Sequence, residues 1–285
     1  MCRTGGRRCP AYSDPQAIAD RNARRRKAYA AKKSVVQPPL EMAFPSLSEV
    51  RKVVGSEDRE LRGKKLEEEL TSSEVEAVGY YTESGYITVR NELVDWELIQ
   101  DLQDNEDVEE PDEDINVIID HLDNVIAKAI PPQNPVPLYR GINVPISVHL
   151  DEVDNWVDAK FPIGGIIQQD NFMSTSSAPQ TAVGFSQPID SMFGNYEDEN
   201  EMRDIMSQER SIVMEILSKK GAVILPSLAG GSYDEQETLL PRNARLKIVG
   251  VHKKQSYSYM TRFRPIDPEI AMVVNRTVIQ VVDAD

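Results

Sequence analysis

The sequence predicts an α+β fold in which a helical N-terminal part precedes a β-rich half. Apolar residues recur at helical spacing before residue 130, whereas after Pro135 short apolar or alternating segments are separated by turn residues. Helices and strands are therefore segregated along the chain instead of alternating, and there is no internal repeat. The chain has 285 residues and 40% hydrophobic residues, enough for one large domain with a tail.

Charge divides the chain into a basic tail, residues 1–45, and an acidic body, residues 46–285. Residues 1–40 hold ten Lys or Arg and two Asp, a net charge of +8, whereas the whole chain carries −15. An acidic body repels nucleic-acid phosphates, so we expect no general nucleic-acid role for the main domain. We interpret the tail as a largely flexible solubilising or sorting arm, and contact with an acidic partner remains open.

The first helices of the body follow the tail. Charges and leucines alternate at helical spacing from Leu47 to Leu70. Thr71 begins the next helix, because its hydroxyl can cap the first turn, where Glu74 places an acid. The apolar face of that helix holds Val75, Val78 and Tyr81. A further amphipathic segment runs from Tyr86 to Leu98.

A strongly acidic stretch comes next. Fourteen Asp or Glu and no Lys or Arg lie between Arg90 and Lys128, which predicts a solvated loop at about 101–114. Because an EF-hand loop needs a central glycine, and this run has none, we do not expect calcium there. Asp114 caps the following helix, which ends at Pro131-Pro132.

The β-rich half begins at Val136. A helix at 151–159 should turn Trp156 inward, and a second helix is expected at 178–185, capped by Ser176 or Ser177. The expected strands are Val136–Ile142, Ile163–Ile167, Phe172–Thr175, Ser211–Ser218, Glu237–Leu240, Arg245–Lys253 and Val273–Val282.

Other residue types exclude several classes. The three histidines show no metal-ligand spacing, and Cys2 and Cys9 have no further ligands near them in the tail, so we expect no metal. We interpret the two cysteines as reduced thiols, with a disulfide between them as the alternative for a protein outside a cell. No window approaches 18 uninterrupted apolar residues, and the basic N-terminus lacks the apolar stretch of a secretory signal. We therefore expect a cytoplasmic protein without a membrane span.

Three segments of the β-rich half together resemble a known family. They are Leu138-Tyr139-Arg140-Gly141, Asn171-Phe172-Met173-Ser174-Thr175-Ser176, and Tyr233-Asp234-Glu235-Gln236-Glu237 followed by Thr238-Leu239-Leu240-Pro241-Arg242. In this order they resemble the arginine–serine–glutamate class of mono-ADP-ribosyltransferases of bacterial toxins, phages and vertebrate ecto-enzymes. Upstream, Tyr81-Thr82, Tyr86, Asn91 and Leu93 resemble the family's first helices, so the resemblance covers roughly residues 60–285.

The resemblance implies a fold and an NAD site. The fold would pack the helical part on an NAD-binding core of two short sheets. Arg140 would bind the pyrophosphate, for which a planar guanidinium is suited, and the backbone of Gly141 would hold the nicotinamide carboxamide. Ser174 would position Glu237 and the nicotinamide ribose. Further NAD-binding residues implied by the resemblance are Asn171, Thr175, Ser176 and Phe185, with core packing an equal alternative for Phe185.

Two glutamates would carry the chemistry. Breaking the nicotinamide–ribose bond creates an oxocarbenium-like centre, as in glycoside cleavage, and a carboxylate from Glu237 would stabilise it. Glu235 precedes Glu237 by two residues, the spacing that places both on one face of an extended segment. In the family, Glu at this position accompanies arginine targets, and Tyr233 would be the exposed aromatic residue of the target-recognition loop.

The sequence departs from the family pattern at a polar insertion, residues 186–210. The family often places a second phosphate-binding basic residue in this region, and Arg203 or Arg210 could take that role. We expect transfer of ADP-ribose from NAD⁺ to arginine of a target protein by a phage- or bacterium-encoded effector. The alternatives are an NAD⁺ glycohydrolase and a virion-associated binding module with the same fold.

Overall fold

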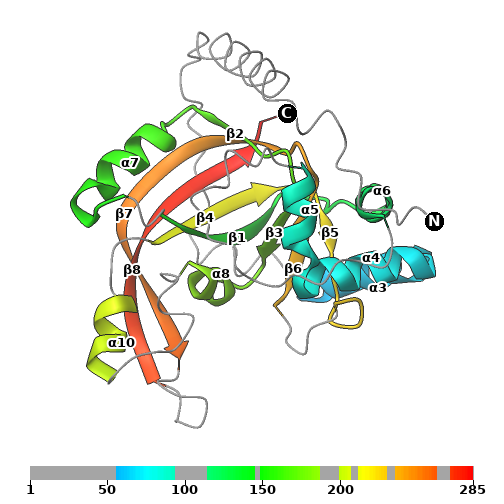
Figure 1. The fold of residues 1–285 in the computed structure, drawn as a ribbon, viewed down its shortest axis with the longest axis horizontal. Helices are drawn as coiled ribbons and strands as arrows, with labels where there is room; N and C mark the ends of the chain where they lie inside the picture. Colours follow the sequence, from blue (N-terminus) through cyan, green and yellow to red (C-terminus); the bar gives the residue numbers. More distant parts are fainter. Residues whose placement is uncertain are drawn as a thin grey trace, which may run out of the picture. The chain divides into compact units, whose positions relative to one another are not determined.

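The computed structural model describes residues 56–93, 114–144, 148–186, 199–206, 211–229, 235–261 and 270–284. The chain divides into two compact units, Met1–Pro39 and Leu40–Asp285, and every described residue belongs to the second (Figure 1). The predicted tail, nearly all of the acidic loop and most of the polar insertion lie outside the described residues.

Four helices and one π-helical turn form the N-terminal part of the second unit. They are α3 (Ser56–Glu69), α4 (Ser72–Tyr80), the π-helical turn η2 (Tyr81–Gly85), α5 (Tyr86–Leu93) and α6 (Ile115–Lys128). Thr71 and Glu74 form a capping box at the start of α4, and the side chain of Asp114 caps α6, so both predicted helix starts are confirmed. None of the described helices is long and apolar enough to span a membrane.

One eight-stranded sheet forms the rest of the unit, in the order β2-β7-β8-β4-β1-β3-β6-β5. Only β4 and β8 pair in parallel, and the other neighbours are antiparallel. The strands are β1 (Val136–Asn143), β2 (Ile166–Gln168), β3 (Met173–Ser176), β4 (Ser211–Ser218), β5 (Ala222–Val223), β6 (Glu237–Leu240), β7 (Arg245–Thr261) and β8 (Ile270–Asp283). The predicted α+β class is therefore confirmed.

The expected two short sheets are in fact one continuous sheet. The junction between its halves is narrow, because β1 pairs with β4 along eight residues but with β3 at a single pair, Tyr139↔Ser176. One side of this junction carries the long strands β4, β7 and β8, and the other carries the short strands β6 and β5. Sequence spacing does not reveal such a junction, since hydrogen bonding across it depends on the register of one pair.

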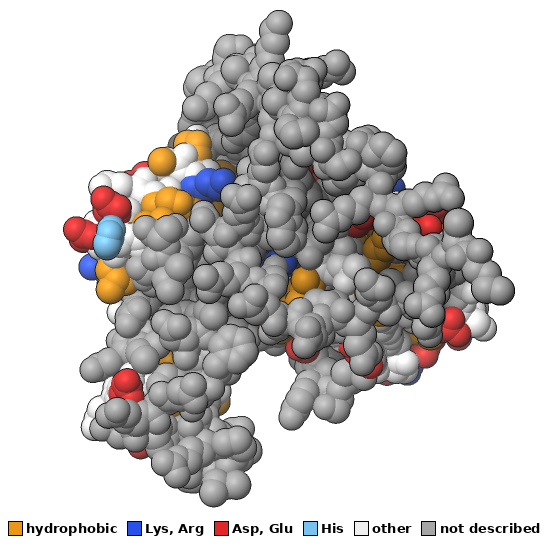
Figure 2. Space-filling model, viewed as in Figure 1, with side chains coloured by type: hydrophobic (Ala, Val, Ile, Leu, Met, Phe, Trp, Pro, Cys, Tyr) orange, Lys and Arg blue, Asp and Glu red, His pale blue; other side chains and the backbone are white. Residues whose placement is uncertain are grey.

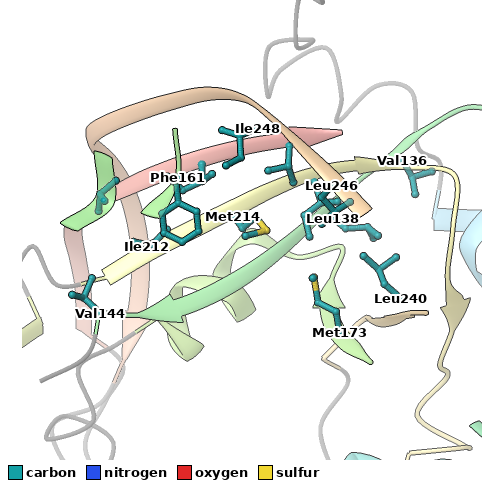
Figure 3. Close-up of a cluster of buried hydrophobic side chains, with 14 of the residues drawn as sticks. Val136, Leu138, Val144, Phe161, Met173, Ile212, Met214, Leu240, Leu246 and Ile248 are labelled. Atoms are coloured by element: carbon teal, nitrogen blue, oxygen red, sulfur yellow. The ribbon is translucent and has the colours of Figure 1, made fainter. Parts of the chain in front are cut away.

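Helices cover both faces of the sheet. On one face, α7 (Val153–Lys160) follows a 3₁₀ turn, η4 (Leu150–Glu152), and contributes to an apolar cluster with β1, β4, β7 and β8, drawn in Figure 3. On the other face, α8 (Pro179–Phe185) packs on β1, and α10 (Glu199–Met206) joins a second cluster around Tyr139 and Val213. A third cluster joins the N-terminal helices to Phe172 and Leu239.

Most other predicted elements are confirmed, with shifted bounds. Trp156 packs against the first apolar cluster, and its ring lies edge-on to that of Phe161, with ring centroids 5.9 Å apart. β7 is longer than predicted because its pairing with β8 continues to Thr261. The pairing resumes after register shifts that follow Ile248 and His252. In Figure 2 the acidic side chains that can be seen lie over α7, over α10 and over the helical part.

Candidate active site

Pairing of β3 with β6 brings two of the three sequence motifs together. The register sets Ser176 opposite Glu237 and Thr175 opposite Thr238. Ser174 and Ser176 therefore point to the same face as Glu237, as strand alternation predicts. Thr175 points to the other face, where its hydroxyl donates a hydrogen bond to the carbonyl of Thr238 at 2.5 Å.

Arg140 brings in the third motif from β1. Its Nη1 donates a hydrogen bond to the carbonyl oxygen of Ser174 at 2.6 Å, next to the single-pair junction of β1 and β3. Burial lowers the pKa of the Arg140 guanidinium, while Tyr81 and Glu237 act in the opposite direction. A guanidinium remains protonated in proteins, so Arg140 places a fixed positive charge near Glu237.

Glu237 is a buried carboxyl group, 9% exposed. The pKa of Glu237 is raised to about 7, chiefly by burial and also by the charge of Glu235, although a hydrogen bond from Ser174 and the charges of Arg140 and Arg59 act to lower it. The group therefore titrates near neutral pH, in the range where a carboxyl group can act both as acid and as anion.

Glu235 lies just before β6 and is exposed. Partial burial raises the pKa of its carboxyl group above the ordinary value, and its charge is felt by Glu237. The predicted extended Glu235–Glu237 segment is wrong in detail, because Gln236 between them has φ +51° and β6 begins only at Glu237. The charge of Glu235 still acts on the Glu237 carboxyl group, although the two residues do not share one extended segment.

Hydrogen bonds fix this turn to β3. The hydroxyl of Ser176 donates to the carbonyl of Glu235 at 2.6 Å and accepts from the backbone amide of Ala178 at 2.9 Å. Ser177 donates to Gln236 from its backbone amide at 3.1 Å and from its hydroxyl at 3.0 Å. The predicted cap by Ser176 or Ser177 is wrong, because Ala178 is the N-cap residue of α8 and no side chain caps the helix. Ser176, two residues earlier, binds the Ala178 amide instead.

Two neighbours of the site were not among the predicted site residues. Tyr81 is buried and its ring stacks edge-on against Phe172, with ring centroids 6.1 Å apart. Its hydroxyl lies 3.4 Å from the Ser174 hydroxyl, within hydrogen-bond distance. Arg59 of α3 donates from Nη2 to the carbonyl of Glu237 at 3.2 Å. Tyr81 was expected on an apolar helix face and in the segment that resembles the family's first helices, but no site role was predicted for it. Arg59 stands in a helix rich in charges, where nothing in the sequence distinguishes it.

Gly141 and Phe185 both lie where α8 packs on β1. A side chain at Gly141 would collide with the α8 backbone at Ala182, Phe185 and Ser186, so the missing Cβ lets α8 pack directly on β1. Phe185 is 49% exposed, which argues against the core alternative for this ring. Asn171 is half-buried at the bend before β3.

The remaining predicted residues lie away from this group or outside the described residues. Arg203 forms an exposed ion pair with Glu199 on α10 at 2.7 Å, and Arg210 and Tyr233 are not described. The buried arginine of this region is instead Arg276 of β8, which donates to Ser186 at 3.0 Å and to the carbonyl of Met206 at 3.1 Å. Burial lowers the pKa of the Arg276 guanidinium to about 10.

Metal ligands are not gathered in the described part of the chain. Within those residues, no three His, Cys, Asp or Glu side chains lie close enough together to hold a metal ion. The groups that converge are instead a guanidinium, a hydroxyl, a phenol and two carboxyl groups. Such a set can bind an anionic, hydroxyl-bearing substrate and stabilise positive charge that develops on it.

Three solved structures of bacterial toxins are similar to this chain. The ADP-ribosylating toxin BECa of Clostridium perfringens, solved with NADH, has a TM-score of 0.50 and 16% identity over 82% of this chain and 48% of its own. The Vis toxin of Vibrio splendidus has a TM-score of 0.47 and 19% identity over 86% and 89%. The C2-I component of Clostridium botulinum has a TM-score of 0.48 and 16% identity over 80% and 48%. This chain therefore spans about half the length of BECa and of C2-I.

Sequence comparison assigns the family. No protein with a curated description is similar enough in sequence to match this chain. The model of the ADP-ribosyltransferase exoenzyme family matches residues 59–263, which include Arg140, Ser174 and Glu237. The matched segment, residues 59–263, makes up well over half of the chain. The chain therefore belongs to the ADP-ribosyltransferase exoenzyme family.

Proposed function

We propose that this protein is an NAD⁺-dependent mono-ADP-ribosyltransferase that transfers ADP-ribose to an arginine side chain of a target protein and releases nicotinamide. One observation carries the proposal: the buried Glu237 carboxyl group lies beside Ser174 and Arg140, with the exposed Glu235 next to it. Membership of the ADP-ribosyltransferase family supports NAD⁺ as the substrate.

Arg140 and Ser174 would prepare the site. Nη1 of Arg140 is bound to the Ser174 carbonyl, which fixes the guanidinium and leaves its other N–H groups for the pyrophosphate of NAD⁺. The Ser174 hydroxyl lies between Tyr81 and Glu237, so it can hold the Glu237 carboxylate toward the nicotinamide ribose. Fixed groups of this kind stabilise a developing charge without rearranging during the reaction.

Glu237 would act on the ribose. When the bond between nicotinamide and ribose C1′ breaks, nicotinamide leaves with the bonding electrons and the ribose gains positive charge. An ionised Glu237 stabilises that charge. Because its pKa is about 7, the active form is populated at neutral pH and lost in acid.

Glu235 would act on the target. A guanidinium is protonated at neutral pH and becomes a nucleophile only when it loses a proton. The exposed Glu235 carboxylate can bind the incoming guanidinium, and it accepts the proton as the guanidinium nitrogen bonds to C1′. The outward position of Glu235 and the inward position of Glu237 suit these two roles.

The biological role proposed for the enzyme is that of a phage- or bacterium-encoded effector. The similar structures named above are toxins, which supports an enzyme that modifies a protein of another cell. Its partner would be a protein with an accessible arginine, reached in the cytoplasm of the target cell. The basic N-terminal tail would contact an acidic partner or serve only as a sorting arm.

Labelling identifies the target class directly. The protein is incubated with isotopically labelled NAD⁺ and a bacterial lysate, and the modified residue of each labelled protein is identified by mass spectrometry. We expect ADP-ribose on arginine. Nicotinamide release without labelled protein would instead indicate an NAD⁺ glycohydrolase, and label on another residue type would contradict arginine specificity.

A further inference from the structure

Arg59 of α3 is bound to the backbone at the start of β6. Its Nη2 donates hydrogen bonds to two carbonyl oxygens, those of Ile224 and Glu237, each at 3.2 Å. These residues lie 165 and 178 positions away in sequence. One guanidinium nitrogen thus joins the N-terminal helical part to both strands that end beside the candidate site.

The two carbonyls mark the end of the β5–β6 ladder. The strands pair at Ala222↔Leu239 and Val223↔Thr238, and the amide of Ile224 continues the pattern by donating to the Glu237 carbonyl at 3.1 Å. Beyond Ile224 the chain turns away from β6. Arg59 therefore supplies hydrogen bonds at the end of the β5–β6 ladder, and one of them binds the backbone of Glu237.

A glycine one turn along the helix permits this contact. A Cβ atom at Gly63 would lie 2.6 Å from Cγ of Leu225, so α3 lies directly against the residue that follows Ile224. Residues four positions apart share a helix face, which puts Arg59 and Gly63 on the same side of α3. Close packing at Gly63 thus holds the Arg59 guanidinium over the ladder end.

Charge adds a second link between Arg59 and Glu237. Burial raises the pKa of the Glu237 carboxyl group, and the positive charge of Arg59 lowers it, as does that of Arg140. Arg59 therefore acts on Glu237 in two ways, through the backbone carbonyl and through its charge.

We propose that Arg59 is a positioning residue for ADP-ribosyl transfer, which holds the Glu237 backbone at the end of the β5–β6 ladder so that the carboxylate keeps its place beside Ser174. This inference rests on the function proposed above. It also differs from a purely structural role, in which Arg59 would tie α3 to the sheet without affecting the reaction.

The test compares Arg59→Met, which removes charge and hydrogen bonds, with Arg59→Lys, which keeps the charge but not the planar fork. Lys64→Met is the matched control, because Lys64 lies on the same helix and is exposed in an ion pair with Glu60. Each full-length variant is assayed for nicotinamide release at several NAD⁺ concentrations and pH values. The Glu237 carboxyl group is titrated separately by ¹³C NMR, its signal assigned by its loss in Glu237→Gln.

We expect Arg59→Met to lower kcat about tenfold or more, with little change in KM, since one charged hydrogen-bonding group is lost. Its Glu237 titration should move to higher pH. Arg59→Lys should lower kcat while leaving that titration close to the original, and Lys64→Met should change neither. If Arg59→Met does not fold, the folded Arg59→Lys variant provides the test. A lowered kcat in Arg59→Lys supports the positioning role of Arg59, and an unchanged kcat overturns the proposal.

A folded Arg59→Met with the original kcat and the original Glu237 titration would overturn the proposal. The NMR measurement also separates the two claims. If the unsubstituted protein releases no nicotinamide, the proposed function fails. In that case an upward shift of the Glu237 titration in Arg59→Met still supports the coupling, and an unchanged titration contradicts it.

Discussion

Ser176 lies directly opposite Glu237 across the β3–β6 ladder, and both side chains point to the same face of the sheet. The Ser176 hydroxyl is nevertheless bound elsewhere, to the Glu235 carbonyl and to the Ala178 amide. Ser176 therefore connects the turn that carries Glu235 to the start of α8. Through these bonds Ser176 holds the backbone of Glu235, two residues before Glu237.

Replacing Ser176 should separate the two reactions. Ser176→Ala removes both hydrogen bonds at a cost of about 1–2 kcal/mol, and frees the turn at Glu235. We expect transfer to an arginine substrate to fall several-fold more than nicotinamide release. Ser256→Ala is the control, because that exposed hydroxyl binds the Asn275 side chain on the β7–β8 pair instead of this turn. Equal losses in both reactions would show that Ser176 acts mainly on NAD⁺.

The raised pKa of Glu237 should make stability fall as pH rises. Its carboxyl group has a pKa of about 7 when folded and about 4.5 when unfolded, so between these values the folded state keeps a proton that the unfolded state has lost. Stability is therefore highest below pH 4.5 for this group and declines toward pH 7.

Glu237→Gln removes this pH-dependent loss. We expect the variant to be more stable than the original protein at pH 8, by about 3 kcal/mol in the free energy of unfolding, with the difference vanishing near pH 4. Thermal unfolding followed by circular dichroism at both pH values measures it. A variant that is less stable at pH 8 would mean that the ionised carboxylate is stabilised more by its neighbours than it is opposed by burial.

Arg140→Lys should weaken NAD⁺ binding. A lysine keeps the charge but not the fork that binds the Ser174 carbonyl and a pyrophosphate together. Loss of one charged hydrogen bond, worth about 1.5–3 kcal/mol, corresponds to about a tenfold to hundredfold rise in Kd. Calorimetric titration with NAD⁺ gives the value, and an unchanged Kd would assign Arg140 to structure alone.

Lys128 should matter more for stability than its position near the surface indicates. Its ammonium group lies 2.6 Å from the Glu74 carboxylate, whose side chain is only 5% exposed. Burial opposes ionisation of Glu74, but its bonds to Lys128 and Thr71 outweigh burial and hold its pKa below the ordinary value.

Lys128→Met leaves that buried carboxylate with the Thr71 bonds alone, and we expect a loss of about 1–3 kcal/mol in the free energy of unfolding. Urea unfolding of Lys128→Met measures the loss, and Lys64→Met, whose ion pair with Glu60 is exposed on both sides, should change little. Equal, small effects in the two variants would show that the Glu74 pair contributes no more than a surface pair.

Sequence predicted the parts of the site that depend on local chemistry. In the site these are the strand around Arg140 and the Ser174-Thr175-Ser176 segment, and elsewhere in the fold the capped start of α6 at Asp114 follows in the same way from a pattern of a few residues. The turn at Gln236 was missed, because a residue type that rarely adopts positive φ gives no signal for it.

Contacts between segments far apart in the sequence could not be predicted from it either. Arg59 meets Glu237 only because α3 packs closely at Gly63, and the one-pair junction of β1 and β3 depends on the register of the whole sheet. The burial of Arg276 could not be predicted for the same reason. Nothing in the sequence of its strand indicates that folding will bury this charged side chain against Ser186 and Met206.

The division of labour between Glu235 and Glu237 is the central claim, and parallel assays of two variants test it most directly. Nicotinamide release without acceptor and transfer of labelled ADP-ribose to an arginine substrate are measured for Glu235→Gln and Glu237→Gln. We expect Glu237→Gln to lose both reactions by about a hundredfold or more, because a neutral amide cannot stabilise the ribose cation. Glu235→Gln should lose transfer but keep most of the nicotinamide release. Near-normal turnover by Glu237→Gln, or equal loss of both reactions in Glu235→Gln, would contradict this account.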